Sequence, residues 1–409
     1  MPEPPLPLPA GITSRYIRTN DLTFHVLEAG RVHNNNRPLI ILLHGFPEIA
    51  YSWRHVLPKL AAAGFHAVAP DQRGFGRTVG WDTRGYSSAD VGSFSLTSLV
   101  RDVVLLVYAL GYRAVRSVVG HDCGAMAAAM CALARPDFFQ SVVLMSHPFN
   151  GSPDLPFGTA DDLSGGALSE ETGPKEGEKA GERGEAGVDI HTALAQIGRK
   201  HYKWYYSTAS ANTDMSSLSA PELYTFLRGY FHLKSGSWPG NQHPHPLREW
   251  SAPELAKMPG YYIMPVDATM PAAVARDITT DPTQGQASQS WLPDAELAVY
   301  AAEYRRTGFQ GGLNWYRVRT TAGGRYSRDV EVFAGKKIES PCAFISGKLD
   351  WGIYQEPGAL ERMRDGVSCA DLRILRLLDG VGHWTPQESP DEVVRAIVDL
   401  VGGLDRCVE

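Results

Sequence analysis

The sequence predicts an α/β fold in which a mostly parallel, doubly wound sheet carries an inserted, mainly helical cap domain. In the first third of the chain, short apolar runs alternate with helical patterns, which is typical of parallel βαβ units. The same rhythm returns near the C-terminus. Between these regions, from about Phe149 to Val332, the strand rhythm stops and tryptophan and tyrosine are frequent. We therefore expect one core built from both ends of the chain.

The expected strands are short and strongly apolar. Leu39–Leu43 reads LIILL, a continuous run that suits a strand buried on both faces. Further runs predict strands at His66–Pro70, Val115–Gly120, Ser141–Met145, Ala343–Ser346 and Leu372–Leu377. Helical patterns predict helices at Leu99–Leu110, Gly124–Ala134 and Asp391–Val401. Because helices separate the strands, we expect parallel pairing with helices on both faces of the sheet.

These elements divide the chain into three parts. Residues 1–148 and 333–409 are expected to form the two parts of the core, and residues 149–332 the helical cap. Within the cap, residues 157–187 are acidic, polar and rich in glycine. Such a segment cannot bury enough apolar area to offset its ordering entropy, so we interpret it as a surface excursion.

Composition argues against several classes of protein. The 409 residues have a formal net charge of −6, and no basic run could follow a nucleic-acid backbone. The five cysteines lack CxxC spacing, which argues against a disulfide framework and a zinc site and favours a reducing, cytoplasmic location. The N-terminus lacks the pattern of a signal peptide. No segment is apolar for about twenty residues, so we expect no membrane span.

The first chemical motif is Gly120-His121-Asp122-Cys123-Gly124, which stands between an expected strand and an expected helix. A sharp turn with flanking glycines presents its middle residue beside a helix N-terminus, which favours a negative charge. Asp122 is therefore a candidate nucleophile, and His121 is interpreted as a structural residue near the turn. Aspartate between two glycines is more often a simple turn or N-cap residue, so this motif needs the support of other segments.

The second motif, His44-Gly45-Phe46-Pro47-Glu48, directly follows the Leu39–Leu43 strand. A turn at this place can aim the backbone N–H of Phe46 at a developing oxyanion, with the N–H of Cys123 as the second donor. Pro47 is a candidate substrate-binding residue in the same turn. The alternative interpretation is an ordinary connection between a strand and a loop.

Two later segments supply an acid and a histidine. Asp350 ends the segment Gly347–Asp350 after one expected strand, and His383 lies in Gly380–Trp384 after the next. Both segments lie at carboxyl ends of strands, where open α/β sheets place their sites. The chain order Asp122, Asp350, His383 is the order of nucleophile, acid and histidine expected on such a sheet. Agreement of four segments in order favours a catalytic site.

These motifs resemble those of the soluble epoxide hydrolases of the α/β-hydrolase superfamily. The likeness extends to Tyr51-Ser52-Trp53-Arg54, Asp71-Gln72-Arg73-Gly74-Phe75-Gly76, Asn314-Trp315-Tyr316-Arg317 and Gly382-His383-Trp384-Thr385. It covers most of the chain except the acidic excursion and the termini. The resemblance implies an α/β-hydrolase fold and hydrolysis of an epoxide to a vicinal diol. It implies no metal and no organic cofactor, and the cap aromatics favour a small, apolar or aromatic epoxide.

The chemistry of the residues fits this reaction. A carboxylate is ionised at neutral pH, so Asp122 could attack the epoxide carbon directly and form a covalent ester. His383, oriented by Asp350, could then activate the water that hydrolyses this ester.

The resemblance also implies two cap tyrosines that protonate the epoxide oxygen. Tyr316 matches one of them. The other lies in Tyr202-Lys203-Trp204-Tyr205-Tyr206, where the family pattern favours Tyr202 and leaves Tyr205 and Tyr206 as alternatives. Further substrate-binding candidates are His147, Trp315, Trp384 and Tyr205.

Alternative functions stay open at this point. A haloacid or haloalkane dehalogenase would use the same Asp122 nucleophile. However, Cys123 stands where the family usually has the tryptophan that holds a halide, and no arginine adjoins Asp122. A non-catalytic, ligand-binding receptor of the same fold is a second alternative, and lactone or ester hydrolysis or a rearrangement is a third. Asp122, Asp350 and His383, which we call the triad, are all present, and together with Tyr316 they favour epoxide hydrolysis.

Overall fold

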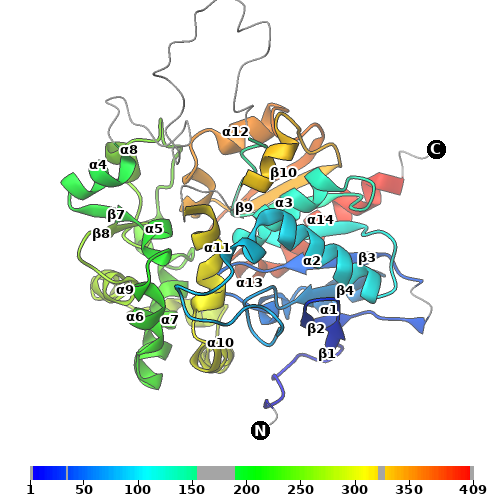
Figure 1. The fold of residues 1–409 in the computed structure, drawn as a ribbon, viewed down its shortest axis with the longest axis horizontal. Coiled ribbons are helices and arrows are strands. Elements are labelled where there is room, and N and C mark those ends of the chain that lie inside the picture. The colour runs from blue at the N-terminus through cyan, green and yellow to red at the C-terminus, as the bar shows by residue number, and fades with distance from the viewer. Residues whose placement is uncertain (1–2, 34–35, 154–188, 321–327, 406–409) are drawn as a thin grey trace, which may run out of the picture.

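The computed structural model describes residues 3–33, 36–153, 189–320 and 328–405 (Figure 1). An eight-stranded sheet with the order β1-β2-β4-β3-β5-β6-β9-β10 lies at its centre. The strands are β1 (Thr13–Arg18), β2 (Thr23–Ala29), β3 (Leu39–Leu43), β4 (His66–Pro70), β5 (Ser117–His121), β6 (Val142–Met145), β9 (Cys342–Gly347) and β10 (Leu372–Leu378). Only the β1–β2 and β2–β4 pairs are antiparallel, so the predicted mostly parallel sheet is confirmed.

The first two strands lack the apolar runs that identify the parallel strands. β1 forms one edge of the sheet and pairs with β2 alone, and of its side chains only Ile17 is buried. β2 is buried almost throughout, yet the polar residues His25 and Glu28 interrupt its sequence. An edge strand buries few side chains, and a buried strand with paired polar groups is not continuously apolar. Neither strand could therefore be found from apolar runs.

Helices of the core pack in two pairs. The short α1 (Leu57–Ala62) contacts α14 (Pro390–Asp405), and α2 (Leu96–Ala109) contacts α3 (Cys123–Ala134). α3 reads CGAMAAAMCALA, and its small side chains allow it to pack closely on β5 and β6. This close packing fixes the start of α3. The turn Gly120–Gly124, which we call the elbow, lies there. The core also contains α12 (Ala359–Arg364), α13 (Thr385–Glu388) and the 3-10 helices η2 (Ala50–Trp53), η3 (Val91–Phe94) and η8 (Trp351–Tyr354).

The chain between β6 and β9 contributes a helical insert, drawn from green to yellow in Figure 1. We call its described residues 189–320 the cap segment. Its helices are α4 (Ile190–Gln196), α5 (Tyr202–Tyr206), α6 (Ser210–Ser216), α7 (Ala220–Leu233), α8 (Ala252–Leu255), α9 (Met270–Ile278), α10 (Asp294–Thr307), α11 (Gln310–Thr320) and the 3-10 helices η5 (Pro239–Asn241) and η6 (Gln286–Ser290).

The cap segment also holds a short antiparallel pair of strands, β7 (Arg199–His201) and β8 (Ile263–Pro265), that the sequence did not reveal. The predicted acidic excursion, residues 157–187, lies outside the described residues. Among the helices that the structure describes, none is long and apolar enough to cross a membrane.

Close backbone contact joins the cap segment to the core. A Cβ atom added at Gly311 would lie 1.9 Å from the carbonyl oxygen of Gly74, so α11 can approach this core turn only because a glycine stands there. Four residues later, the indole Nε1 of Trp315 donates a hydrogen bond to the Arg73 carbonyl at 2.9 Å. These contacts fix the helix that carries Tyr316.

Candidate active site

Asp122 lies at the turn between β5 and α3. Its backbone has φ 53° and ψ −122°, a conformation that residues other than glycine rarely adopt. A Cβ atom at Gly120 would lie 2.2 Å from the Gly124 carbonyl oxygen, and one at Gly124 would lie 2.4 Å from the His44 carbonyl oxygen. The turn therefore requires glycine on both sides of Asp122, which explains the spacing of the motif physically.

The carboxylate of Asp122 lies beside the imidazole of His383. His383 Nε2 is 3.3 Å from Asp122 Oδ2, and His383 Nδ1 is 3.1 Å from Asp350 Oδ1. The N–H of Gly352 and the hydroxyl of Ser346 donate to the two oxygens of Asp350 at 2.6 and 3.1 Å. Asp350 is thereby fixed, and the imidazole is held between two carboxylates from distant parts of the sequence.

The turn after β3 approaches the same carboxylate. The backbone N–H of Phe46 donates to Asp122 Oδ1 at 3.2 Å. A Cβ atom at Gly45 would lie 2.4 Å from the Cβ of Asp122, so only glycine allows this approach. Pro47, buried in the same turn, follows Phe46 through a cis peptide bond. Within the described residues, Cys123 makes no backbone hydrogen bond to the carboxylate.

The surroundings of Asp122 favour its ionised form. Burial alone would raise its pKa, but the interaction with His383 and the positive charge of Lys234 hold the pKa of Asp122 well below its usual range. Burial would also raise the pKa of Asp350, and His383 lowers it below its usual value. Both carboxylates are therefore ionised at neutral pH, and Asp122 needs no base to become a nucleophile.

Lys234 belongs to the site although sequence reasoning did not identify it. Its side chain is buried, and its Nζ lies 5.0–5.4 Å from the ring centroids of Tyr230, Tyr262 and Trp384. Its backbone carbonyl accepts a hydrogen bond from the N–H of His383 at 2.8 Å. Aromatic faces attract an ammonium group, which offsets part of its desolvation. Nothing in the sequence separates Lys234 from a surface lysine, because its surroundings come from three separate segments.

A buried pair, His121 and Glu48, supports the loop that carries His383. His121 Nδ1 lies 2.6 Å from Glu48 Oε2, and His121 Nε2 lies 2.7 Å from the carbonyl oxygen of His383. Burial would raise the pKa of Glu48, but the charge of His121 lowers it to about 2. Burial would lower the pKa of His121, and Glu48 instead raises it. These contacts agree with the structural interpretation of His121.

The Glu48–His121 pair should make the folded state sensitive to acid. The pKa of Glu48 is about 2 in the folded state against an ordinary value of 4.5. The pair therefore stabilises the fold above pH 4.5, and its contribution is lost as the pH falls toward 2. We expect the free energy of unfolding to fall by up to about 3 kcal/mol over this window. Urea unfolding at a series of pH values measures this free energy of unfolding. An equal fall for wild type and Glu48→Gln between pH 4.5 and 2 would contradict the expectation.

Tyr316 and Tyr202 lie together on the cap side of the site. Their ring centroids are 5.9 Å apart, and the ring of Tyr316 is 5.7 Å from that of Phe46. Burial raises the pKa of both phenols well above the usual value, and the charge of Asp122 raises it further. Both are therefore protonated at neutral pH. Tyr202 donates to Gln355 Oε1 at 3.1 Å, whereas the Tyr316 hydroxyl has no hydrogen-bond partner in the described part of the chain.

The two alternative tyrosines of α5 lie differently. The hydroxyl of Tyr205 donates to Asp214 Oδ2 at 2.9 Å within the cap segment, and its ring faces Lys200. The hydroxyl of Tyr205 is thus bonded within the cap segment, and its role in substrate binding stays a prediction. The ring of Tyr206 lies 5.1 Å from that of Tyr316. Tyr206 is thus the nearer alternative to Tyr202 as the first proton donor.

Trp384 also lies differently from its expected place. It is fully buried, and its indole Nε1 donates to the Phe231 carbonyl at 2.7 Å. Its ring centroid lies 4.7 Å from that of His383. Trp384 therefore packs against the imidazole of His383, and its role in substrate binding stays a prediction.

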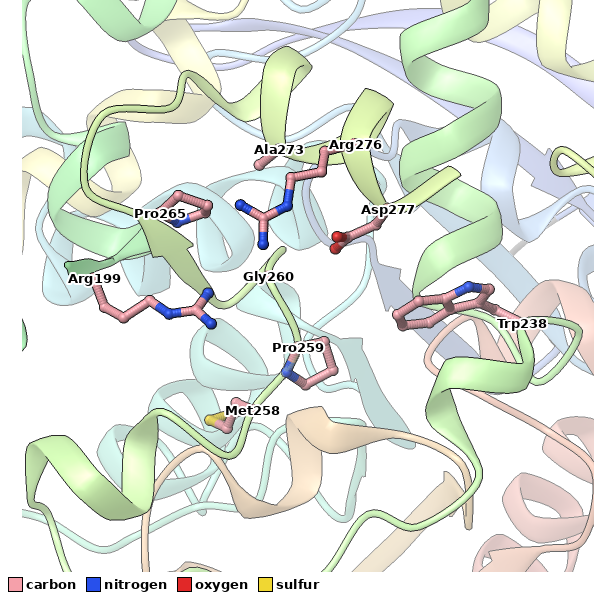
Figure 2. A pocket seen from close by; sticks show the side chains of 9 residues that line it. All are labelled: Arg199, Trp238, Met258, Pro259, Gly260, Pro265, Ala273, Arg276 and Asp277. Atoms are coloured by element: carbon pink, nitrogen blue, oxygen red, sulfur yellow. The ribbon is translucent and has the colours of Figure 1, made fainter. Parts of the chain in front are cut away.

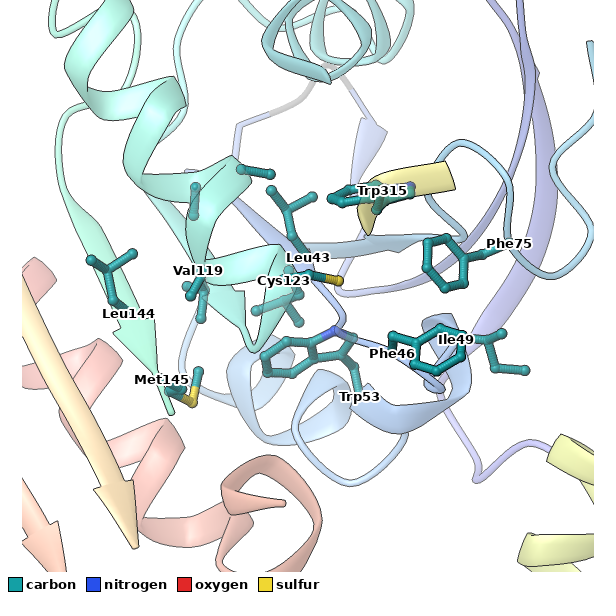
Figure 3. Packing of buried hydrophobic residues seen from close by; sticks show 14 of the residues in the cluster. Leu43, Phe46, Ile49, Trp53, Phe75, Val119, Cys123, Leu144, Met145 and Trp315 are labelled. Carbon is teal, nitrogen blue, oxygen red and sulfur yellow. The ribbon is translucent and has the colours of Figure 1, made fainter. Parts of the chain in front are cut away.

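Trp315 and His147 remain beside the site. Trp315 lies across from Cys123 and packs against Phe75, as Figure 3 shows, and Trp315 and Cys123 line the same small pocket. His147 is buried, and its Nε2 lies 3.5 Å from Glu356 Oε1 without a hydrogen-bond partner. Both positions are compatible with contact to a ligand near the elbow.

A separate pocket of about 250 Å³ lies in the cap segment. Figure 2 shows the guanidinium groups of Arg199 and Arg276 extending toward it, with Asp277 and Trp238 on its other side. None of the triad residues lines this pocket. The candidate active site is therefore identified by the geometry of its side chains and not by the size of a cavity.

Known proteins of similar sequence and structure share this architecture. The family model described as alpha/beta hydrolase fold matches residues 38–169. Epoxide hydrolase B of Mycobacterium tuberculosis is 30% identical over 374 residues, which cover 90% of this chain and 92% of that protein. Epoxide hydrolase A of the same species is 30% identical over 400 residues, covering 96% and 98%.

Solved structures agree with these relatives. An epoxide hydrolase from an endophytic Streptomyces matches with a TM-score of 0.71 and 28% identity, covering 97% of both chains. A mutant of the epoxide hydrolase from Solanum tuberosum matches with a TM-score of 0.67 and 26% identity, covering 96% of this chain and 99% of that one. The likeness thus extends over the core and the helical insert alike.

Proposed function

Because the chain belongs to the epoxide hydrolase family of the α/β-hydrolase fold, we propose that it opens an epoxide to a vicinal diol through a covalent ester on Asp122. The observation that carries this proposal is the ionised carboxylate at the elbow, with His383 Nε2 3.3 Å from its Oδ2. A carboxylate can displace the oxygen from a saturated carbon, and the resulting ester has a carbonyl that water can attack.

Ring opening is the first proposed step. A carboxylate oxygen of Asp122 bonds to an epoxide carbon, the C–O bond breaks, and the epoxide oxygen takes a proton from a phenol. Tyr316 is the proposed proton donor, because its hydroxyl has no hydrogen-bond partner in the described part of the chain. Tyr202 is proposed to exchange its bond to Gln355 for a hydrogen bond to the same oxygen.

Hydrolysis of the ester is the second proposed step. Water attacks the ester carbonyl of Asp122 while His383 Nε2 accepts its proton, and Asp350 stabilises the imidazolium that forms. The N–H groups of Phe46 and Cys123 are the proposed donors to the tetrahedral oxyanion. Collapse of this intermediate breaks the ester C–O bond, the second proton of the water passes to the leaving oxygen to release the diol, and the proton on His383 returns to the tyrosinate.

We further propose that the substrate is held between the two parts of the chain. In this proposal, residues 1–148 and 333–409 form the core and residues 149–332 form the cap. Phe46, Tyr202 and Tyr316 offer mainly aromatic surface around Asp122, which supports a small epoxide with an apolar or aromatic body. Pro47, His147 and Trp315 are the proposed further contacts.

The proton donors can be told apart by single substitutions. Tyr316→Phe should slow formation of the ester by about 10²-fold or more, because it removes a general acid. Tyr202→Phe should slow it by a smaller factor, since Tyr316 can still donate. Single-turnover measurement of ester formation tests both variants. Tyr205→Phe serves as the matched control because that hydroxyl is bonded to Asp214. A loss with Tyr205→Phe as large as that with Tyr316→Phe would contradict the assignment.

A comparison of two substrates tests the proposed function itself. The wild-type protein is incubated with styrene oxide and, separately, with chloroacetate, and the diol and free chloride are measured. We expect diol from styrene oxide and no chloride release above the uncatalysed rate. Chloride release without diol formation would overturn the proposal in favour of the dehalogenase alternative, which uses the same Asp122 nucleophile.

A further inference from the structure

Arg319 carries a positive charge beside the site and forms no ion pair with a carboxylate in the described part of the chain. It lies on α11, three residues after Tyr316, so both side chains emerge from neighbouring positions of one helix. Within the described residues, no aspartate or glutamate forms an ion pair with its guanidinium. Its Nη1 instead lies 2.9 Å from the sulfur of Met126, which is a weak acceptor. Most N–H groups of the guanidinium therefore have no protein acceptor among the described residues.

The guanidinium lies at a small pocket next to the elbow. Arg319 lines this pocket together with Cys123, Met126 and Trp315, and Figure 3 shows two of these side chains, Cys123 and Trp315. The remaining lining residues are largely apolar: Phe94, Ser95, Leu96, Leu99 and Val318. The free space is about 10 Å³, room for about one water-sized group such as a carboxylate oxygen. The pocket thus suits the charged end of a ligand whose body lies elsewhere.

Glu356 interacts electrostatically with Arg319 but forms its ion pairs with other groups. Glu356 is already shared by two neighbours, with Lys203 Nζ 3.4 Å and His147 Nε2 3.5 Å from its Oε1. Burial lowers the pKa of His147, which favours its neutral form. Burial would raise the pKa of Glu356, but Lys203, His147 and Arg319 together lower it to about 2, so this one carboxylate faces two cations. The carboxylate of Asp122 contacts His383 and the N–H of Phe46 and forms no ion pair with Arg319.

We propose that Arg319 binds a carboxylate of the substrate, so that the epoxide hydrolysed here belongs to an anionic molecule with an apolar body. This inference rests on the proposed function and deepens it. A guanidinium donates charge-assisted hydrogen bonds to a carboxylate, which would place one carboxylate oxygen in the small pocket. It also offsets the repulsion between the substrate anion and the ionised Asp122, and it anchors the substrate through a group remote from the reacting carbon.

A matched pair of substrates tests this assignment. The para-carboxylate of styrene oxide and its para-carboxamide have nearly the same size and differ in charge. We expect kcat/KM of the wild type to favour the carboxylate by about tenfold or more, the worth of a charge-assisted hydrogen bond. Arg319→Gln should lose this preference, and Arg319→Lys should restore part of it. Arg113→Gln is the control, because it removes the same charge from an exposed guanidinium that contacts Tyr108.

A binding measurement keeps this inference separate from the proposed function. Calorimetry compares para-ethylbenzoate with para-ethylbenzamide, neither of which can react. Tighter binding of the benzoate that is lost in Arg319→Gln supports the inference. Equal kcat/KM for the two epoxides in wild type, or a preference that persists in Arg319→Gln, overturns it. Turnover of neither epoxide would overturn the proposed function, and the benzoate comparison would still decide the role of Arg319.

Discussion

Asp122→Asn is expected to lower the turnover of styrene oxide by at least about 10⁴-fold, because the amide is neutral and cannot act as the nucleophile. Asparagine has nearly the same shape as aspartate and tolerates a positive φ better than most residues, so the turn at φ 53° should persist. Turnover is measured as diol formed per enzyme at saturating substrate. The loss should appear in ester formation, since the variant has no anionic oxygen with which to attack.

The control for this variant must separate catalysis from folding. Asp137→Asn removes the same charge from an exposed carboxylate that pairs with Arg135, just beyond the C-terminal end of α3. It should keep wild-type turnover. Asp122→Asn should also keep the wild-type circular dichroism spectrum, which shows that the fold is intact. Substantial diol formation by a folded Asp122→Asn protein would mean that another group attacks the epoxide.

His383→Gln should separate the two proposed steps. The Asp122 carboxylate can still attack, but no imidazole accepts the proton of the hydrolytic water, so the ester should accumulate. Steady-state turnover should fall by about 10³-fold or more while one equivalent of epoxide is consumed rapidly. Intact-mass measurement after mixing should show the protein heavier by the mass of one substrate molecule.

His243→Gln serves as the matched control, since His243 is exposed on the cap segment. It should turn over at the wild-type rate and show no adduct. A folded His383→Gln protein that neither consumes one equivalent of epoxide nor gains mass would contradict the two-step scheme. Loss of the adduct in the double variant Asp122→Asn/His383→Gln would assign the ester to Asp122.

The parts of the site that lie at turns could be predicted from the sequence. Glycine is required beside Asp122 and at Gly45 because a Cβ atom would collide there, and such requirements leave a local signature. The positions of His383 and Asp350 follow from the ends of apolar strands, which are equally local. The fold class was predictable for the same reason, since β3 and β6 are buried and apolar throughout and β4 and β5 are buried with only a few polar residues.

The residues that depend on side-chain direction could not be predicted in this way. On α5, Tyr202 and Tyr206 are four residues apart and both lie beside Tyr316, whereas Tyr205 is turned toward Asp214. The sequence predicts a mainly helical cap but not the direction in which each tyrosine side chain points. Trp384 follows His383 directly and yet packs behind it, because its neighbours belong to the cap segment.

Charged groups without a local motif were also beyond prediction. Aromatic rings from three segments hold Lys234 beside the triad. The proposed role of Arg319 depends on the lack of a carboxylate partner among the described residues. The edge strand β1 was missed because it buries little. In each case the missing information is tertiary, since it concerns which distant residues come near.

A single turnover in water enriched in heavy oxygen, with enzyme in excess over epoxide, tests the central claim most directly. If the Asp122 ester forms and water attacks its carbonyl, mass analysis will find heavy oxygen in the Asp122 peptide and none in the first diol. Heavy oxygen in the diol, with none in that peptide, would mean that water attacks the epoxide itself and would contradict the account.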